Sequence, residues 1–113
     1  MKLLTAAQRA QMLKNALENR EQEHDHRPVV KLFTPDANAT WLLTELDPDD
    51  TDRAFGLCDL GLGCPELGYV SLAELESVRG PMGLAVERDR YFTASQTLAV
   101  YAAEARVGRR IRA

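Results

Sequence analysis

The sequence predicts an α+β fold, in which an antiparallel sheet of four to five strands packs with an N-terminal helix, a short central helix and a C-terminal helix. Helix-start signals and apolar residues at helical spacing occur in both halves of the chain. Between them lie four short runs of β-branched, aromatic and other apolar residues. The loops that join these runs have about 4–6 residues, which is too short for the crossover that parallel strands need. The predicted sheet is therefore a meander.

The length and composition of the chain are those of one folded domain. It has 113 residues, of which 45% are hydrophobic and 27% are charged, and we expect a single domain over residues 1–113. No apolar run approaches the roughly 18 residues that span a bilayer. No apolar signal-peptide segment follows the first residues either. We therefore expect a cytoplasmic protein without a membrane partner.

The first helix is predicted over residues 5–20. Thr5 and Gln8 have the spacing of a capping box, in which each side chain accepts the other residue's backbone N–H. Apolar residues then recur at helical spacing, namely Ala6, Ala10, Leu13 and Leu17. The helix gives way to a polar loop that is closed by Arg27 and Pro28, because the residue before a proline avoids the helical region.

The sheet is predicted over residues 29–70. Its strands are expected at residues 29–34, 40–46, 53–60 and 66–70. Asp47, Pro48, Asp49 and Asp50 form a turn signal between the second and third strands. Gly56, inside the third strand, predicts a bulge or a close approach of two backbones.

Two further helices are predicted in the second half of the chain. Ser71 and Glu74 have capping-box spacing and open a short helix over residues 72–79. We expect Gly80 to end it in a left-handed conformation before Pro81. Residues 83–89 are ambiguous and leave a fifth strand open. A C-terminal helix is predicted over residues 94–107, followed by a basic tail over residues 108–113.

The charge is unevenly distributed along the chain. The formal net charge is −3, which argues against a dedicated binder of duplex DNA. Five acids without a base follow one another in the second strand and the turn after it, and we call them the acidic patch: Glu45, Asp47, Asp49, Asp50 and Asp52. Four arginines gather at the other end of the chain: Arg106, Arg109, Arg110 and Arg112. Either group could contact a partner, and either could be solvated surface.

No catalytic motif is present, and we expect neither a metal nor a cofactor. His24 and His26 are the only histidines, and their i, i+2 spacing lacks the fixed geometry of a helical metal site. Cys58 and Cys64 do not have a common zinc-site spacing, and we expect free thiols. We also expect no preorganised pocket lined by reactive groups, and hence a protein that is not an enzyme.

Polar residues flank the ends of several predicted elements in the second half. If the sheet and the short helix converge there, a network of arginines and carboxylates would form from Glu66, Arg79, Glu87, Arg88 and Asp89. Such a network would be either a polar site or a structural ion-pair cluster. Aromatic residues on an exposed sheet could stack single-stranded bases. For Phe33, Trp41, Phe55 and Tyr69, however, we favour core packing.

Several sequence blocks together are similar to a known bacterial family. They include Phe33-Thr34-Pro35, Ala39-Thr40-Trp41, Thr44-Glu45-Leu46-Asp47-Pro48, Phe55-Gly56, Glu66-Leu67-Gly68-Tyr69-Val70-Ser71-Leu72, Arg79-Gly80-Pro81 and Glu87-Arg88-Asp89. In this order they resemble the family of domain of unknown function 2958, over residues 1 to about 93. Cys64 and Ala85 depart from it, where we expect an aromatic residue and a proline. The resemblance implies an accessory protein of a plasmid, integrative element or phage, without an implied activity, cofactor or site residue.

Two main hypotheses follow for the function. The first is a small non-enzymatic protein of a mobile element that binds a host or element-encoded protein through the acidic patch, as an anti-defence inhibitor would. The second is a nucleic-acid accessory factor that contacts phosphates through its C-terminal arginines. A third and weaker hypothesis is a small enzyme or metal protein that uses His24, His26 or the region of Arg79 and Glu87. The oligomeric state stays open.

Overall fold

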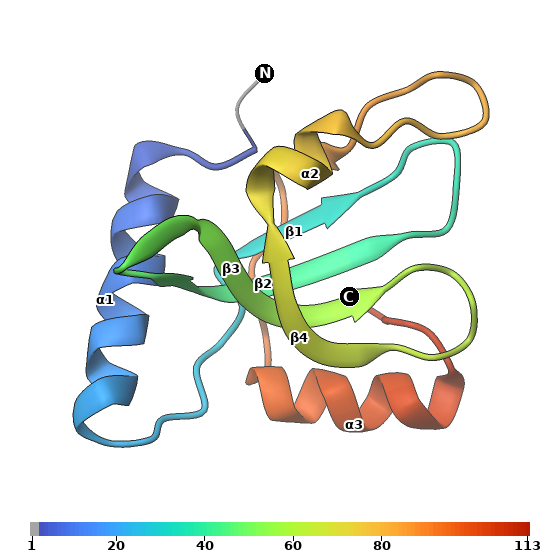
Figure 1. The fold of residues 1–113 in the computed structure, drawn as a ribbon. Helices are drawn as coiled ribbons and strands as arrows, with labels where there is room; N and C mark the ends of the chain where they lie inside the picture. The colour runs from blue at the N-terminus through green and yellow to red at the C-terminus, as the bar shows by residue number, and fades with distance from the viewer. Residues whose placement is uncertain (1–2) are drawn as a thin grey trace.

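The structure is a computed structural model that describes residues 3–113. Its sheet has the strand order β4-β3-β2-β1-β5, with every neighbouring pair antiparallel (Figure 1). The strands are β1 (Val30–Phe33), β2 (Thr40–Asp47), β3 (Asp50–Asp59), β4 (Glu66–Ser71) and β5 (Glu87–Arg88). The predicted meander is confirmed, and the ambiguous residues 83–89 contain a short fifth strand, β5, which pairs with β1.

Three helices complete the α+β fold that the sequence predicts. They are α1 (Ala6–Glu21), α2 (Leu72–Ser77) and α3 (Leu98–Gly108). In Figure 1, α3 runs along one side of the sheet, apart from α1 and α2. The capping box of α1 is formed, because the side chains of Thr5 and Gln8 each accept the other residue's backbone N–H. None of the helices within residues 3–113 is long and apolar enough to cross a membrane.

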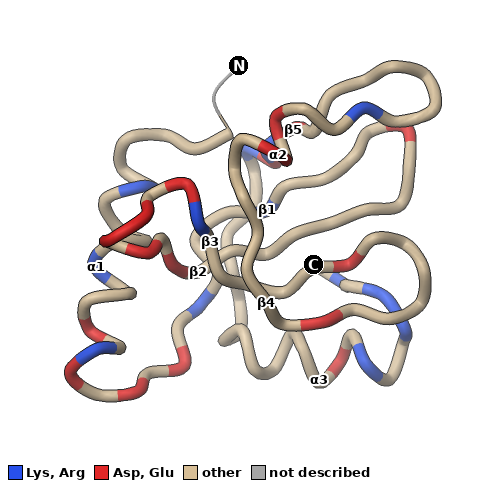
Figure 2. The backbone as a smooth tube through the Cα atoms, in the orientation of Figure 1, with Lys and Arg blue, Asp and Glu red and all other residues tan. Residues whose placement is uncertain are grey.

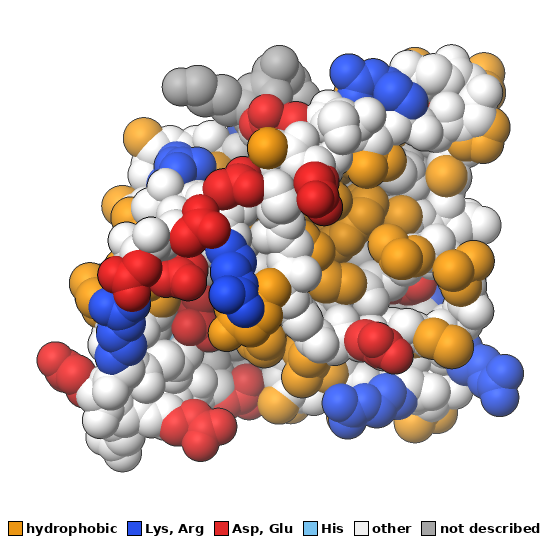
Figure 3. All heavy atoms as spheres, in the orientation of Figure 1, with side chains coloured by type: hydrophobic (Ala, Val, Ile, Leu, Met, Phe, Trp, Pro, Cys, Tyr) orange, Lys and Arg blue, Asp and Glu red, His pale blue; other side chains and the backbone are white. Residues whose placement is uncertain are grey.

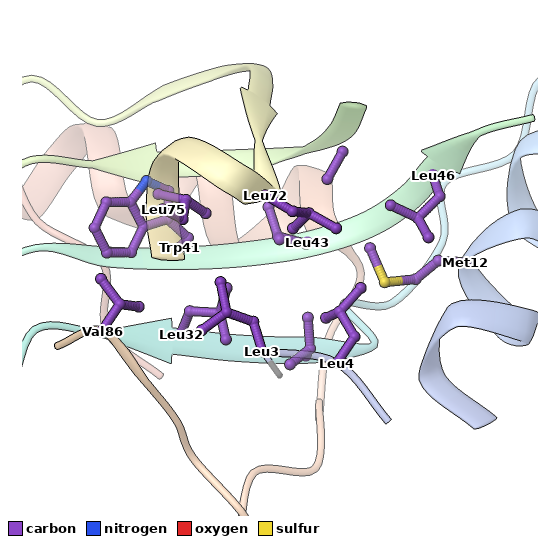
Figure 4. Close-up of a cluster of buried hydrophobic side chains, with 12 residues drawn as sticks. Leu3, Leu4, Met12, Leu32, Trp41, Leu43, Leu46, Leu72, Leu75 and Val86 are labelled. Carbon is purple, nitrogen blue, oxygen red and sulfur yellow. The ribbon is translucent and has the colours of Figure 1, made fainter. Parts of the chain in front are cut away.

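Each face of the sheet carries its own apolar cluster. On one face, side chains of α1 and α2 pack with residues of β1 and β2, among them Met12, Leu72, Leu32 and Trp41 (Figure 4). On the other face, α3 packs with the central strands through side chains such as Tyr101. The second cluster consists of Leu42, Leu57, Leu98, Tyr101, Ala102 and Ala105. The central strands are therefore buried on both sides.

A bulge in β2 places two of its buried leucines on the same face of the sheet. Leu43 pairs with Gly56 and Glu45 pairs with Phe55, so Thr44 is an extra residue in β2. The extra residue places Leu43 and Leu46 on the same face, which strict alternation would forbid. The side chain of Asn15 on α1 donates a 2.9 Å hydrogen bond to the carbonyl oxygen of Thr44. Gly56 is required opposite the bulge, because a Cβ there would overlap the backbone of Leu42.

The short central helix ends differently from the prediction. α2 stops at Ser77, and the glycines with positive φ among residues 3–113 are Gly61, Gly63 and Gly83, not Gly80. Gly80 has a different role, because a Cβ there would overlap the carboxylate of Asp36 in the β1–β2 loop. That carboxylate accepts a 2.7 Å hydrogen bond from the backbone N–H of Met82. It thereby holds the loop that follows α2.

The C-terminal helix begins later than predicted. It starts at Leu98 rather than at residue 94, and its N-cap residue, Thr97, makes no side-chain capping bond. The cap comes instead from the loop after α1. The carboxylate of Asp25 accepts the N–H of Ala99 at 3.1 Å, and the carbonyl of His26 accepts the N–H of Leu98 at 2.9 Å. A cap supplied by a distant segment leaves no local signal in the sequence.

Candidate functional site

The last residues of the chain turn back onto the sheet. Arg109 follows α3 in a left-handed conformation, with φ of 60°, and so reverses the direction of the chain. The backbone N–H of Ile111 then donates to the carboxylate of Asp59 at 2.9 Å. At the chain end, the ammonium group of Lys31 on β1 donates to the backbone oxygen of Ala113 at 2.7 Å. The predicted basic tail is thus held against the sheet, and Figure 2 shows its basic positions in blue.

Asp59 joins three segments at one end of the sheet. Its side chain lies at the end of β3 and is only 2% exposed. One carboxylate oxygen accepts the N–H of Ile111, and the other accepts the N–H of Gly61 at 2.8 Å. A buried carboxylate requires such partners, because an unpaired one would pay the full cost of leaving water. Asp59 therefore fixes the β3–β4 loop and the C-terminal segment together.

The segment after β5 is fixed in a similar way. The backbone N–H of Asp89 donates to the carbonyl of Lys31 at 2.9 Å, which extends the pairing of β5 with β1. The carboxylate of Asp89 lies 3.7 Å from the Lys31 ammonium group and accepts the N–H of Tyr91 at 2.9 Å. The side chain of Tyr91 is nevertheless 93% exposed.

These segments enclose an open groove with a volume of about 990 Å³. Its walls come from β1, the β1–β2 loop, the end of β3, the β5 segment and the C-terminal segment. Ionisable and aromatic residues line it, namely Lys31, Phe33, Asp59, Glu87, Arg88, Asp89, Arg90, Tyr91, Arg109 and Arg110. The side chain of Arg88 lies on the other face of the sheet, because Arg88 pairs with the buried Leu32 and donates to the carbonyl of Leu3 at 3.1 Å. The sequence predicted no preorganised pocket with reactive groups, and the structure does contain this open groove lined by ionisable residues.

Three arginines supply the exposed positive charge of the groove. Of the other two basic residues that line it, Lys31 lies 3.7 Å from the carboxylate of Asp89, and Arg88 donates to the carbonyl of Leu3. Arg90, Arg109 and Arg110 are exposed to solvent. The arrangement can bind an anionic ligand, and the planar guanidinium groups suit phosphate in particular.

Half of the groove's charged and aromatic residues are candidates from the sequence, in two separate groups: Glu87, Arg88 and Asp89, and Arg109 and Arg110. The other half carry no site prediction: Lys31, Asp59, Arg90 and Tyr91, together with Phe33, for which core packing is predicted. A partial signal exists for Asp59, because Asp-x-Gly after a strand is typical of a turn closed by the aspartate.

The proposed polar network is divided between the two edges of the sheet. Glu66 begins β4 at one edge, whereas Glu87 and Arg88 form β5 at the other. The guanidinium group of Arg79 donates to the backbone carbonyls of Glu76 and Val78, which lie beside it in the chain. The expected convergence of all five residues is therefore wrong. Only Glu87, Arg88 and Asp89 are among the residues that line the groove, and the guanidinium group of Arg88 donates to the carbonyl of Leu3 on the other face of the sheet.

The acidic patch surrounds the β2–β3 turn. Red side chains gather there in Figure 3, with basic side chains between them. The guanidinium group of Arg20 lies 2.8 Å from the carboxylate of Asp49 and 3.8 Å from that of Asp47. Part of the patch's charge is therefore balanced by α1.

Asp52 serves the structure of α2. Its carboxylate accepts hydrogen bonds from the Ser71 hydroxyl and from the backbone N–H of Ala73, in the first turn of the helix. These two bonds lower the pKa of Asp52 below its ordinary value, since they favour the ionised form. Asp52 is therefore a capping residue as well as a member of the acidic patch.

The two histidines and the two cysteines are not among the residues that line the groove. The rings of His24 and His26 are 5.5 Å apart, and the Nε2 atom of His26 is 3.7 Å from the carboxylate of Glu18. No group of three or more metal-ligating side chains of the His, Cys, Asp or Glu type occurs within residues 3–113. Both cysteines are free, as predicted. Burial, assisted by the charge of Glu66, raises the pKa of the Cys58 thiol to about 11.

The fold and the groove define a small α+β protein with an open groove, lined by charged and aromatic residues, at one end of its sheet. The chain belongs to the family described as Protein of unknown function (DUF2958), whose model matches residues 3–112. The resemblance drawn from the sequence blocks is therefore confirmed, and the match extends into the C-terminal segment that forms one wall of the groove. No curated protein and no solved structure matches the chain.

Proposed function

We propose that this protein is a non-enzymatic binding protein that holds a nucleic acid in its basic groove. The observation that carries the proposal is the fixed position of Arg109 and Arg110. The hydrogen bond from Ile111 to Asp59 holds the segment of both arginines beside the groove that Lys31 and Arg90 also line. Nucleic-acid phosphates bind to such clusters of lysine and arginine.

The net charge of −3 does not oppose this function, because binding depends on the local potential rather than on the sum over the chain. The acidic patch lies at the β2–β3 turn, whereas the groove lies at the other end of these two strands. A preformed wall also lowers the cost of binding, since a disordered tail would have to be ordered at that moment.

The test is the affinity for short nucleic acids as a function of salt. We expect binding of a fluorescently labelled ten-nucleotide strand, measured by anisotropy, to weaken steeply as sodium chloride is raised. In the double variant Arg109→Gln/Arg110→Gln, two phosphate contacts are lost. The slope of log affinity against log salt should then fall by about 1.4 for a single strand.

Arg106→Gln is the matched control. Arg106 lies on α3, is exposed, and is not among the residues that line the groove. If it weakens binding as much as the double variant does, the contact depends on general positive charge and the groove is not the site. Absence of salt-dependent binding to any nucleic acid would contradict the function itself.

A second proposal concerns the acidic patch, because its side chains do gather on one face of the molecule (Figure 3). A protein with a basic surface, such as a host defence factor, is the partner that its charge fits. Capture from a host lysate at low salt should then be lost in the triple variant Glu45→Gln/Asp49→Asn/Asp50→Asn. Equal capture by the variant would remove the proposal.

The biological setting is also a proposal. The family resemblance supports a role as a cytoplasmic accessory protein of a mobile element, and the two free cysteines are those of a protein in a reducing compartment. Consistent placement of the gene among transfer or phage genes would support this setting. Placement among unrelated chromosomal genes would contradict it.

A further inference from the structure

We infer that the groove takes single-stranded rather than duplex nucleic acid, with an unpaired base stacked on Tyr91. This inference rests on the proposed function and adds the strandedness of the ligand and the residue that reads it. Tyr91 lines the groove beside its cations, and 93% of the residue's surface is exposed.

Tyr91 is exposed although its backbone is fixed. Its N–H donates to the Asp89 carboxylate at 2.9 Å, and the N–H of Phe92 lies 3.4 Å from the Asp89 carbonyl. Phe92 packs against the apolar cluster under α3, which anchors the chain on the other side. The tyrosine ring therefore stands out from a short, anchored turn.

The other exposed tyrosine, Tyr69, differs from Tyr91 because neighbouring side chains contact its ring. Tyr69 on β4 lies 5.1 Å from the Phe55 ring, and the guanidinium group of Arg53 lies 3.8 Å above its face. Tyr69 is 58% exposed, because these neighbours cover part of it. Tyr91 has much more of its surface in solvent and offers a free face to a ligand.

The combination of groups selects the strandedness of the ligand. Arg90, Arg109 and Arg110 can contact phosphates of any nucleic acid. An aromatic ring, in contrast, can stack only on a base whose face is open, and in a duplex both faces are covered by neighbouring base pairs. Phe33 provides a second aromatic side chain in the same groove. The groove volume of about 990 Å³ is at the upper end for small-ligand pockets and leaves room for more than one nucleotide.

The experiment compares three labelled probes by anisotropy at one low salt concentration: a ten-nucleotide oligothymidylate, a ten-nucleotide oligouridylate and a ten-base-pair DNA duplex. We expect at least one single strand to bind about tenfold more tightly than the duplex. Which of the two binds more tightly then distinguishes DNA from RNA as the source, since both share phosphates and open bases.

The variants separate stacking from charge. Tyr91→Ala should weaken single-strand binding about tenfold and leave duplex binding unchanged, since stacking contributes about 1–3 kcal/mol per base. Tyr91→Phe should bind like the original protein, because it keeps the ring. Arg109→Gln/Arg110→Gln should weaken binding of all probes.

Two results overturn the inference while the proposed function survives. One is equal affinity for duplex and single strands, and the other is a Tyr91→Ala variant that binds single strands as tightly as the original protein. If none of the three probes binds, both the proposed function and the inference are wrong. Tyr91→Ala will fold, because a side chain this exposed contributes little to stability.

Discussion

The carboxylate of Asp59 accepts the backbone N–H of Ile111 at 2.9 Å and so joins the end of β3 to the last residues of the chain. The two residues are 52 positions apart in the sequence. Its second carboxylate oxygen accepts the N–H of Gly61. This buried side chain therefore fixes two segments that line the groove, one with Gly61 and the other with Arg109 and Arg110.

Replacing Asp59 should destabilise the protein and loosen its C-terminal segment. In Asp59→Ala two backbone N–H groups lose a charged acceptor, and we expect the free energy of unfolding to fall by about 2–3 kcal/mol. Urea unfolding measures this loss, and hydrogen exchange at the amide of Ile111 should become faster. Glu23→Ala, in an exposed loop, is the control and should change stability by less than about 0.5 kcal/mol. Equal stability of Asp59→Ala and the original protein would show that Asp59 does not hold this segment.

A side chain at position 80 should destabilise the protein. In Gly80→Ala the new methyl group would overlap the carboxylate of Asp36, so we expect a loss of about 1–3 kcal/mol in thermal or urea unfolding. Gly68→Ala is the matched control, because nothing lies within 4 Å of a Cβ at that position on β4. The double variant Gly80→Ala/Asp36→Ala should cost less than the sum of the single changes. Strict additivity would argue against a clash between these two residues.

The contribution of Asp52 should depend on pH. Its pKa is lowered in the folded protein, so the ionised side chain stabilises the fold at pH values above the ordinary value of 3.8. This contribution is lost as the pH falls below 3.8 and through the lowered value. Asp52→Asn should therefore be less stable than the original protein at pH 7, and the difference should shrink toward pH 2–3. Urea unfolding at both pH values measures it, and a difference that does not depend on pH would contradict the assignment.

The two cysteines should react at very different rates. Cys64 is exposed, whereas burial raises the pKa of Cys58 to about 11, so little Cys58 thiolate exists at pH 8. An aromatic disulfide reagent should titrate one thiol quickly and the second only after the protein is unfolded in urea. The variant Cys64→Ala should lose the fast phase. Two fast thiols would show that Cys58 is accessible in the folded chain.

The elements of the fold were predictable wherever their signals are local. The capping box of Thr5 and Gln8, the alternating runs and the Asp-Pro-Asp-Asp turn together predicted α1 and the meander. Gly80 misled the prediction, because a glycine after a helix usually marks a left-handed cap. Here its small size accommodates Asp36 from a distant loop, and no local pattern reveals that contact.

The groove was less predictable, because it exists only when distant segments meet. Its lining residues come from β1, β3, the β5 segment and the C-terminus, and they span positions 31 to 111. Arg109 and Arg110 could be noticed as a charge cluster, but a sequence cannot show that Asp59 holds the chain beside them. The exposure of Tyr91 could not be predicted either, since the sequence around it does not distinguish an exposed tyrosine from a buried one.

The bulge at Thr44 also bears on how the sheet finds its alignment. The amide of Asn15 on α1 donates to the carbonyl of Thr44, the extra residue of β2. If β2 slipped by a single position against β3, this amide would be buried without an acceptor, and the leucines of β2 would exchange faces. The hydrogen bond from α1 to Thr44 therefore favours the observed register of β2 over a shifted one.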